Sequence, residues 1–147
     1  MSNKIFLDAA VLISAALSST GASRELLVLS QQGVVELITN RNAIIETERN
    51  LSRKSENGLT VFRALMATSI ITVVDSPSEE AVEKAAEYTV AKDAPIVAGA
   101  IETESTYLAT FDRKHLINPP EVAEKSGLMI DTAGNVLQAV REKLDLQ

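Results

Sequence analysis

Short apolar segments alternate with longer segments of helical pattern along this chain, and that alternation restricts its fold more than any other feature. The five strand-like segments are 4–7, 34–39, 70–74, 107–110 and 128–131. The helix-like segments are 9–17, 23–32, 40–54, 58–68, 78–90, 95–101 and 134–144. Strands that alternate with helices are typical of a parallel sheet with helices on both faces. We therefore expect an α/β fold: three α/β/α layers around a doubly wound, mainly parallel central sheet of about five strands.

Residues 113–127 are the one long segment without a clear pattern. Pro119 and Pro120 interrupt it, so we expect a loop with one helical turn there. We find no repeat, linker or low-complexity segment, and a chain of 147 residues is long enough to form a core without metal or disulfides. The sequence thus predicts a single domain over residues 1–147.

Composition excludes several classes of site. The sequence has no cysteine, which rules out disulfides, thiolate metal sites and a cysteine nucleophile. A net charge of -6 and an aromatic content of 3% argue against a basic coat on nucleic acid and against an extended base-stacking platform. No signal peptide and no membrane-spanning run are evident, so we expect a cytoplasmic protein without membrane contact.

Three aspartates stand at the ends of predicted elements. Asp8 directly follows the first strand, and Asp112 comes two residues after Thr110 at the end of the fourth. Asp93 precedes the helix that begins near Pro95, so it is predicted to be the N-cap of that helix. In an open parallel sheet, ligands bind at the carboxyl ends of the strands. Asp8 and Asp112 are therefore expected at the functional edge of the sheet.

Carboxylates that converge on one edge repel one another, by about 4 kcal/mol per pair at about 4 Å and an effective dielectric constant of about 20. A bound cation would relieve this repulsion. Because the candidate ligands are oxygen atoms, Mg²⁺ or Mn²⁺ is the expected cofactor, with a glutamate of the 40–54 helix as a further ligand. Such a site suits hydrolysis of a phosphodiester.

Four segments carry a resemblance to the PIN domain family of metal-dependent nucleases, which includes VapC-type toxins. They are LDAAVLISAALSSTGAS, IIETERNLSRK, KDAPIVAGAIE and YLATFDRKHL, and the resemblance extends from Ile5 to about Leu137. It implies an RNA substrate, an acidic Mg²⁺ or Mn²⁺ site, a homodimer and, in the toxin branch, an antitoxin protein as partner.

Carried over position by position, the resemblance implies four metal-binding and catalytic acids and one supporting hydroxyl: Asp8, Glu46, Asp93, Asp112 and Thr110. The sequence departs from the family pattern at two places. Ala9 and Ala10 follow the first acid where polar residues are usual, and His115 and Leu116 stand where many members have a further acid.

Glu46 has a competitor on the same predicted helix. The helical wheel turns Glu48 inward with Ile44 and Leu51, whereas the family spacing favours Glu46. His115 is a further candidate base or ligand, although a single histidine in such a segment more often lies on the surface without a chemical role. Several basic residues flank the acids and either steer a phosphate backbone or are simply solvated: Arg49, Arg53, Lys54, Arg113 and Lys114.

Three function classes follow from these residues. The first is a metal-dependent endoribonuclease. The second is a catalytically weak module of the same fold that binds RNA or a protein, which Ala9 and Ala10 favour. The third is phosphoryl chemistry on a small molecule; it ranks last because enzymes with an aspartyl nucleophile usually have a second acid at the position of Ala10.

Overall fold

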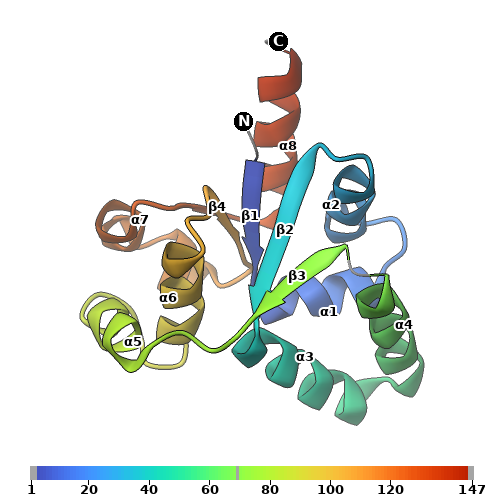
Figure 1. The fold of residues 1–147 in the computed structure, drawn as a ribbon, viewed down its shortest axis with the longest axis horizontal. Helices are drawn as coiled ribbons and strands as arrows, with labels where there is room; N and C mark the ends of the chain where they lie inside the picture. Colours follow the sequence, from blue (N-terminus) through green and yellow to red (C-terminus); the bar gives the residue numbers. More distant parts are fainter. Residues whose placement is uncertain (1–2, 69, 146–147) are drawn as a thin grey trace.

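The central element is a five-stranded sheet in the order β3-β2-β1-β4-β5 (Figure 1). The computed structural model describes residues 3–68 and 70–145. Its strands are β1 (Asn3–Leu7), β2 (Val35–Asn40), β3 (Ile71–Val74), β4 (Tyr107–Ala109) and β5 (Met129–Asp131). Each neighbouring pair runs parallel. The predicted doubly wound parallel sheet is confirmed.

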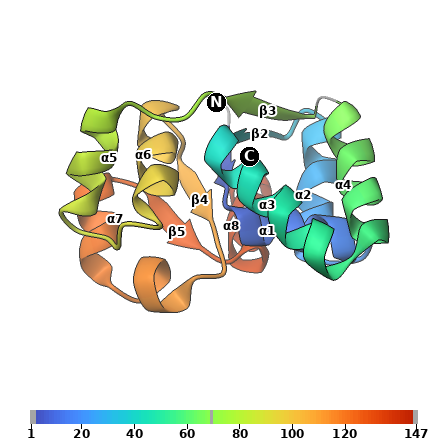
Figure 2. The same cartoon turned by 90° about the horizontal axis from the view of Figure 1, so that it is seen from below.

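Helices cover both faces of this sheet and complete three layers (Figures 1 and 2). One side carries α1 (Ala9–Leu17), α2 (Ala22–Gln31), α3 (Arg41–Lys54), α4 (Glu56–Ala67) and α8 (Ala133–Asp145). The other side carries α5 (Glu79–Ala86), α6 (Ala94–Glu102) and α7 (Pro120–Ser126). This division follows from right-handed crossovers, because the chain builds outward from β1 to β3 and then resumes on the other side of β1.

The chain adds β2 and β3 on one side of β1 and then β4 and β5 on the other, and this change of direction creates a crevice between the carboxyl ends of β1 and β4. These two strands are neighbours in the sheet, with Leu7 opposite Ala109. The segment after β1 enters α1 on one face, whereas the segment after β4 leads to α7 on the other. Side chains that directly follow the two strands therefore meet in an open crevice, the usual ligand site of a doubly wound sheet.

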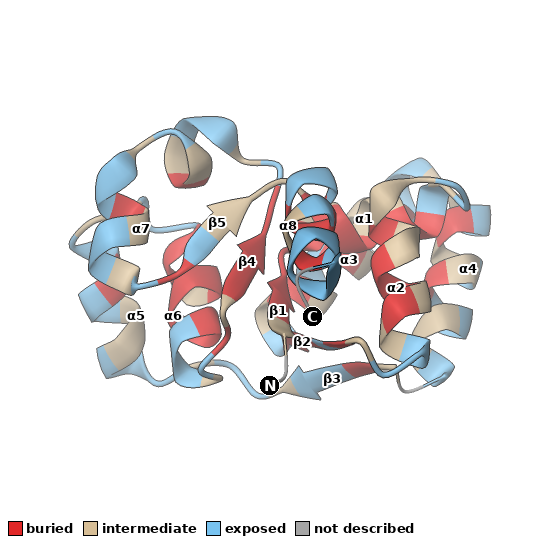
Figure 3. Ribbon diagram, turned by 90° about the horizontal axis from the view of Figure 1, so that it is seen from above, coloured by how far each residue is buried: buried red, intermediate tan, exposed pale blue. Residues whose placement is uncertain are grey.

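The core is centred on β1 and β4, which are buried on both faces (Figure 3). Ile5, Phe6 and Leu108 have no exposed surface. The edge strands are more open, since Val73 of β3 is 45% exposed and Met129 of β5 is 54% exposed. Continuous burial of the central strands is typical of a parallel sheet and gives their carboxyl ends a rigid support. None of the described helices is long and apolar enough to span a bilayer.

The prediction for residues 113–127 was incomplete, because two helical elements lie there. A single turn of π-helix, η1 (Arg113–Ile117), begins directly after Asp112. The helix α7 starts at Pro120, because the first turn of a helix needs no amide donor from that residue. It ends at Gly127, whose φ of 75° is readily adopted only without a side chain. The proline pair therefore begins a helix.

The predicted 78–90 helix was too long, since α5 ends at Ala86. Turn hydrogen bonds from the amides of Tyr88 and Thr89 to Ala85 close it. At α4 the error is the opposite: the helix begins at Glu56 because the Ser55 hydroxyl accepts a hydrogen bond from the Gly58 amide at 2.9 Å. Helix ends depend on such local caps more than on the apolar pattern.

Helix α6 packs closely against the sheet at Gly99. A Cβ atom at this position would lie 2.5 Å from Asn40 Nδ2 and 2.9 Å from Phe6 Cζ. Asn40 is fully buried and donates a hydrogen bond to the Pro95 carbonyl at 3.1 Å. Gly99 thus allows α6 to approach the carboxyl ends of β1 and β2, and so sets the position of the residue that precedes α6, Asp93.

We expect Gly99→Ala to lower the free energy of unfolding by about 1 to 3 kcal/mol, because the added methyl group would overpack Asn40 and Phe6. Urea denaturation measures this change. Gly134→Ala is the matched control, since its Cβ would meet no atom closer than 3.9 Å. Equal stability of Gly99→Ala and the wild type would contradict this account of α6 packing.

Candidate active site

Asp8 lies at the end of β1 and is held by two hydrogen bonds. Its Oδ1 accepts from the Ala9 amide at 2.7 Å, and its Oδ2 accepts from the Thr110 hydroxyl at 2.7 Å. Thr110 is fully buried, and Asp8 is 8% exposed. The same hydroxyl accepts a hydrogen bond from the Asp112 amide at 3.1 Å. Thr110 therefore fixes Asp8 relative to the segment that follows β4.

Asp112 is held by the π-helical turn that it precedes. Its Oδ1 accepts a hydrogen bond from the His115 amide at 2.9 Å. Its Oδ2 lies 3.3 Å from His115 Nδ1 and 3.8 Å from Lys92 Nζ. The sequence favoured a surface position for His115, and the structure instead places its ring against this carboxylate.

Asp93 occupies the N-cap position of α6, as predicted, but its side chain does not cap the helix. Its backbone is already helical, with φ -95° and ψ -15°, and its carboxylate accepts no hydrogen bond from the first turn of α6. The residue is 7% exposed, and its Oδ2 atom is buried without a hydrogen-bond partner among the described residues. The nitrogen His115 Nδ1 lies 3.9 Å from this oxygen, at ion-pair distance. The carboxylate is therefore available for a ligand.

Glu46 and Glu48 point to different parts of the surface from α3. Glu46 lines the same cleft as Asp8 and Asp93. Glu48 lies 3.7 Å from Arg63 of α4 and lines a separate cavity beside β3. Of the two alternatives that the sequence left open, the structure brings Glu46 to the acidic cluster and places Glu48 away from it.

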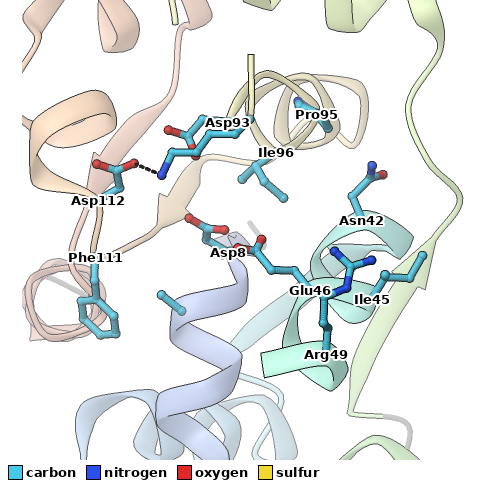
Figure 4. A pocket seen from close by; sticks show the side chains of 12 residues that line it. Asp8, Asn42, Ile45, Glu46, Arg49, Asp93, Pro95, Ile96, Phe111 and Asp112 are labelled. Atoms are coloured by element: carbon cyan, nitrogen blue, oxygen red, sulfur yellow. Dashed lines mark ion pairs between the residues drawn. The ribbon is translucent and has the colours of Figure 1, made fainter. Parts of the chain in front are cut away.

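The four acids surround one open cleft of about 580 Å³ (Figure 4). They come from the end of β1, from α3, from the start of α6 and from the segment after β4. One oxygen each of Asp93 and Asp112 and one nitrogen of His115 lie within 4.8 Å of one another. The remaining lining residues are Ala10, Asn42, Ile45, Arg49, Lys92, Pro95, Ile96 and Phe111. The crevice between β1 and β4 is therefore acidic at its centre, and its rim carries both basic and apolar side chains.

A sequence model of the PIN domain matches residues 4–114, which include all four acids. This chain belongs to the PIN domain family. Membership supports nuclease activity as a class. Comparison with curated proteins gives no match.

Three solved structures resemble this PIN domain. VapC20 of Mycobacterium tuberculosis, described as a toxin that cleaves the sarcin-ricin loop, has a TM-score of 0.55 and 17% identity over 75% of this chain and 91% of its own. VapBC2 of Rickettsia felis, bound to a DNA fragment from its promoter, has a TM-score of 0.60 and 13% identity over 88% of this chain and 98% of its own. FitAcB of Neisseria gonorrhoeae has a TM-score of 0.57 and 17% identity over 88% of this chain and 97% of its own. At these identities the likeness establishes the fold alone.

The cluster of acids shifts the protonation of its members in opposite directions. Burial, together with the neighbouring carboxylate of Asp112 and its charge, raises the pKa of Asp93 to about 7, and Lys92 opposes this only in part. For Asp112, burial acts to raise the pKa, but the His115 amide, Asp93 and the His115 ring outweigh it and lower the pKa. Below about pH 7, Asp93 in the metal-free PIN domain is therefore mainly protonated while Asp112 is ionised.

Burial also raises the pKa of Asp8, and the hydrogen bonds from Thr110 and Ala9 offset this only partly. The charges of Glu46 and Asp112 act in the same direction as burial. Two of the four acids thus resist ionisation in this environment. A cation would reverse this effect, because it stabilises the charged form of each carboxylate.

A divalent cation fits the groups present. Asp93 Oδ2 is a buried oxygen that accepts no hydrogen bond from the described residues, and the oxygen atoms around it come from hard carboxylate ligands of the kind that Mg²⁺ and Mn²⁺ prefer. Asp8, Asp93, Asp112 and Glu46 would hold it. The His115 ring is engaged with Asp112, so it supports a ligand rather than completing the oxygen set.

Sequence reasoning did not identify six lining residues as site residues: the polar or aromatic Asn42, Lys92 and Phe111, and the apolar Ile45, Pro95 and Ile96. Lys92 and Phe111 are immediate neighbours of Asp93 and Asp112, and Asn42 stands one helical turn before Glu46. Adjacency to a predicted acid was the available signal. Arg49, which the sequence did suggest, lines the cleft, whereas Arg53, Lys54, Arg113 and Lys114 are not among its lining residues.

We expect the metal-free protein to lose stability from about pH 4 to about pH 7. Because the pKa of Asp93 is raised above its ordinary value of 3.8 to about 7, its contribution to stability is complete below the ordinary value and is lost as the pH rises through 7. The lowered pKa of Asp112 acts at lower pH, outside this window. Thermal unfolding in a chelator measures the loss as a lower Tm.

The substitution Asp93→Asn should remove this part of the pH dependence, because an amide cannot ionise. Asp75→Asn, an exposed aspartate outside the cleft, should keep the wild-type dependence. The comparison separates the loss of a carboxylate in the cleft from the loss of an exposed carboxylate outside it. Identical pH dependence of Asp93→Asn and the wild type would contradict the placement of a proton on Asp93.

Proposed function

We propose that this PIN domain is an endoribonuclease that hydrolyses RNA phosphodiester bonds with Mg²⁺ or Mn²⁺. The observation that carries the proposal is the buried Asp93 oxygen that accepts no hydrogen bond from the described residues and lies beside Asp112 in one cleft with Asp8 and Glu46. Four ionised carboxylates are unfavourable together, and a bound cation would stabilise all of them in the ionised form. RNA hydrolysis is the chemistry that such a site and this family membership favour together.

The bound cation would polarise the scissile phosphate and lower the pKa of an attacking water. The chain's own residues prepare the site for this. Asp8 and Asp112 are held in fixed orientations by Thr110 and His115, so they need no reorganisation on binding. Lys92 and Arg49 are cations at the rim, where they can attract the phosphates of the substrate.

RNA as the substrate is supported by one of the similar structures, since VapC20 is described as cleaving the sarcin-ricin loop. We further propose that the protein is the toxin of a toxin-antitoxin pair, acts as a homodimer and binds an antitoxin protein. VapBC2 and FitAcB, to which this fold is similar, support that proposal.

The alternative is a module of the same fold that binds RNA or a protein without strong catalysis. The residues that favour it are Ala9 and Ala10, which bring no polar atom after Asp8, and Leu116, which is fully buried and offers no further acid. RNA binding without turnover in Mn²⁺, unaffected by Asp112→Asn, would support this alternative and overturn the nuclease.

Glu46→Gln should lower the rate of RNA cleavage in Mn²⁺ about 100-fold or more, because it removes a negative charge from the cation site. Glu48→Gln is the matched control: it makes the same chemical change two residues away, at a side chain paired with Arg63, and should retain the wild-type rate. Cleavage of labelled RNA measures both. Equal rates for the two variants would contradict the role of Glu46.

Thr110→Val should weaken Mn²⁺ binding about 10- to 100-fold, because it removes the hydrogen bond that orients Asp8. Thr110→Ser keeps the hydroxyl and should bind Mn²⁺ with nearly the wild-type affinity. Titration calorimetry measures both, and circular dichroism checks that each variant is folded. A Thr110→Val variant that binds Mn²⁺ as tightly as Thr110→Ser would show that this hydrogen bond does not position Asp8.

A further inference from the structure

Phe111 is exposed in a way that the other aromatic residues of the protein are not. Phe6, Phe62 and Tyr107 are buried, and Tyr88 is half-buried. Phe111 is 41% exposed. It follows a fully buried residue in the sequence and lines the acidic cleft (Figure 4). This large apolar ring lies outside the core and lines a charged cleft, so it is available to contact what the cleft binds.

The backbone on both sides of Phe111 is fixed. The Thr110 amide donates a hydrogen bond to the Asp131 carbonyl at 3.0 Å, and the Thr110 hydroxyl accepts one from the Asp112 amide at 3.1 Å. The Arg113 amide donates to the Phe111 carbonyl at 3.1 Å. The ring is therefore presented from a rigid segment, and a ligand would meet a side chain whose backbone is already ordered.

The opposite wall of the cleft also combines an exposed apolar side chain with a charged one. Figure 4 shows Asp8 and Glu46 between Phe111 on one side and Ile45 on the other. Ile45 is 48% exposed, and Arg49 follows it by one helical turn of α3. A phosphate alone would gain nothing from these apolar groups, whereas a nucleotide has a charged phosphate and a base with flat, weakly polar faces.

We propose that Phe111 stacks against the nucleobase next to the scissile phosphate and is a specificity residue of this site. The inference rests on the proposed nuclease function. The base must be unpaired, because both faces of a base in a duplex are covered by neighbouring base pairs. One stacking residue agrees with the low aromatic content of the chain, which excludes an extended platform.

The first test compares Phe111→Ala with Phe111→Tyr in Mn²⁺, using a short single-stranded oligoribonucleotide of mixed sequence. Phe111→Ala should raise KM about tenfold or more and change kcat much less, since stacking binds the substrate before and during the reaction. Phe111→Tyr should restore KM because it keeps the ring. Ile101→Ala, a similarly exposed residue outside the cleft, is the control and should leave KM unchanged.

The second test does not depend on turnover. The sequence has no tryptophan, so Phe111→Trp places a single fluorescent reporter at the cleft. With Ca²⁺ in place of Mn²⁺, the single-stranded oligoribonucleotide should quench this fluorescence, and the same oligonucleotide annealed to its complement should not.

An unchanged KM in Phe111→Ala, or a tryptophan signal that single-stranded RNA does not alter, would overturn the stacking role while leaving the nuclease intact. A wild-type protein that cleaves no RNA would instead refute the proposed function. The fluorescence titration still decides the role of Phe111 in that case, since quenching by the single strand alone supports stacking and its absence overturns it.

Discussion

Four carboxylates from four separate elements meet at one edge of the sheet, and their mutual repulsion is the constraint to which the surrounding residues respond. The response is visible in their protonation: burial and the neighbouring acid raise the pKa of Asp93 to about 7, while the His115 amide and ring are among the groups that keep Asp112 ionised. Thr110 bridges Asp8 and the Asp112 backbone. These hydrogen bonds orient Asp8 and Asp112, whereas one buried Asp93 oxygen accepts no hydrogen bond from residues 3–68 and 70–145.

The fold explains why these acids are together although they are far apart in the sequence. The strand order places the carboxyl ends of β1 and β4 side by side, so Asp8 and Asp112 meet at the point where the sheet changes direction. Gly99 and Asn40 bring α6 close to the same edge, and with it Asp93. The buried central strands supply the rigidity that a site of repelling charges requires.

Much of this arrangement could be predicted from the sequence, because it depends on periodicity and on which residues follow apolar strands. Asp8 and Asp112 were expected at the carboxyl edge for that reason, and the choice of Glu46 over Glu48 depended on the family spacing, since the helical wheel alone indicated Glu48. Other features depend on local hydrogen bonds and tertiary contacts, which a single sequence does not reveal. They are the conformation of the Asp93 side chain, the π-helical turn that brings the His115 ring to Asp112, and the helix that begins at Pro120. The metal, the RNA substrate and the roles of the acids stay predictions.

The most direct test of the central claim, that the acids form one cation site, is Mn²⁺ binding by titration calorimetry to the wild type and to the double variant Asp93→Asn with Asp112→Asn. The account predicts that the wild type binds Mn²⁺ and that the folded double variant does not, since the variant loses two of the four charges that make the site. A wild type that binds no Mn²⁺, or a double variant that binds it equally well, would contradict the account.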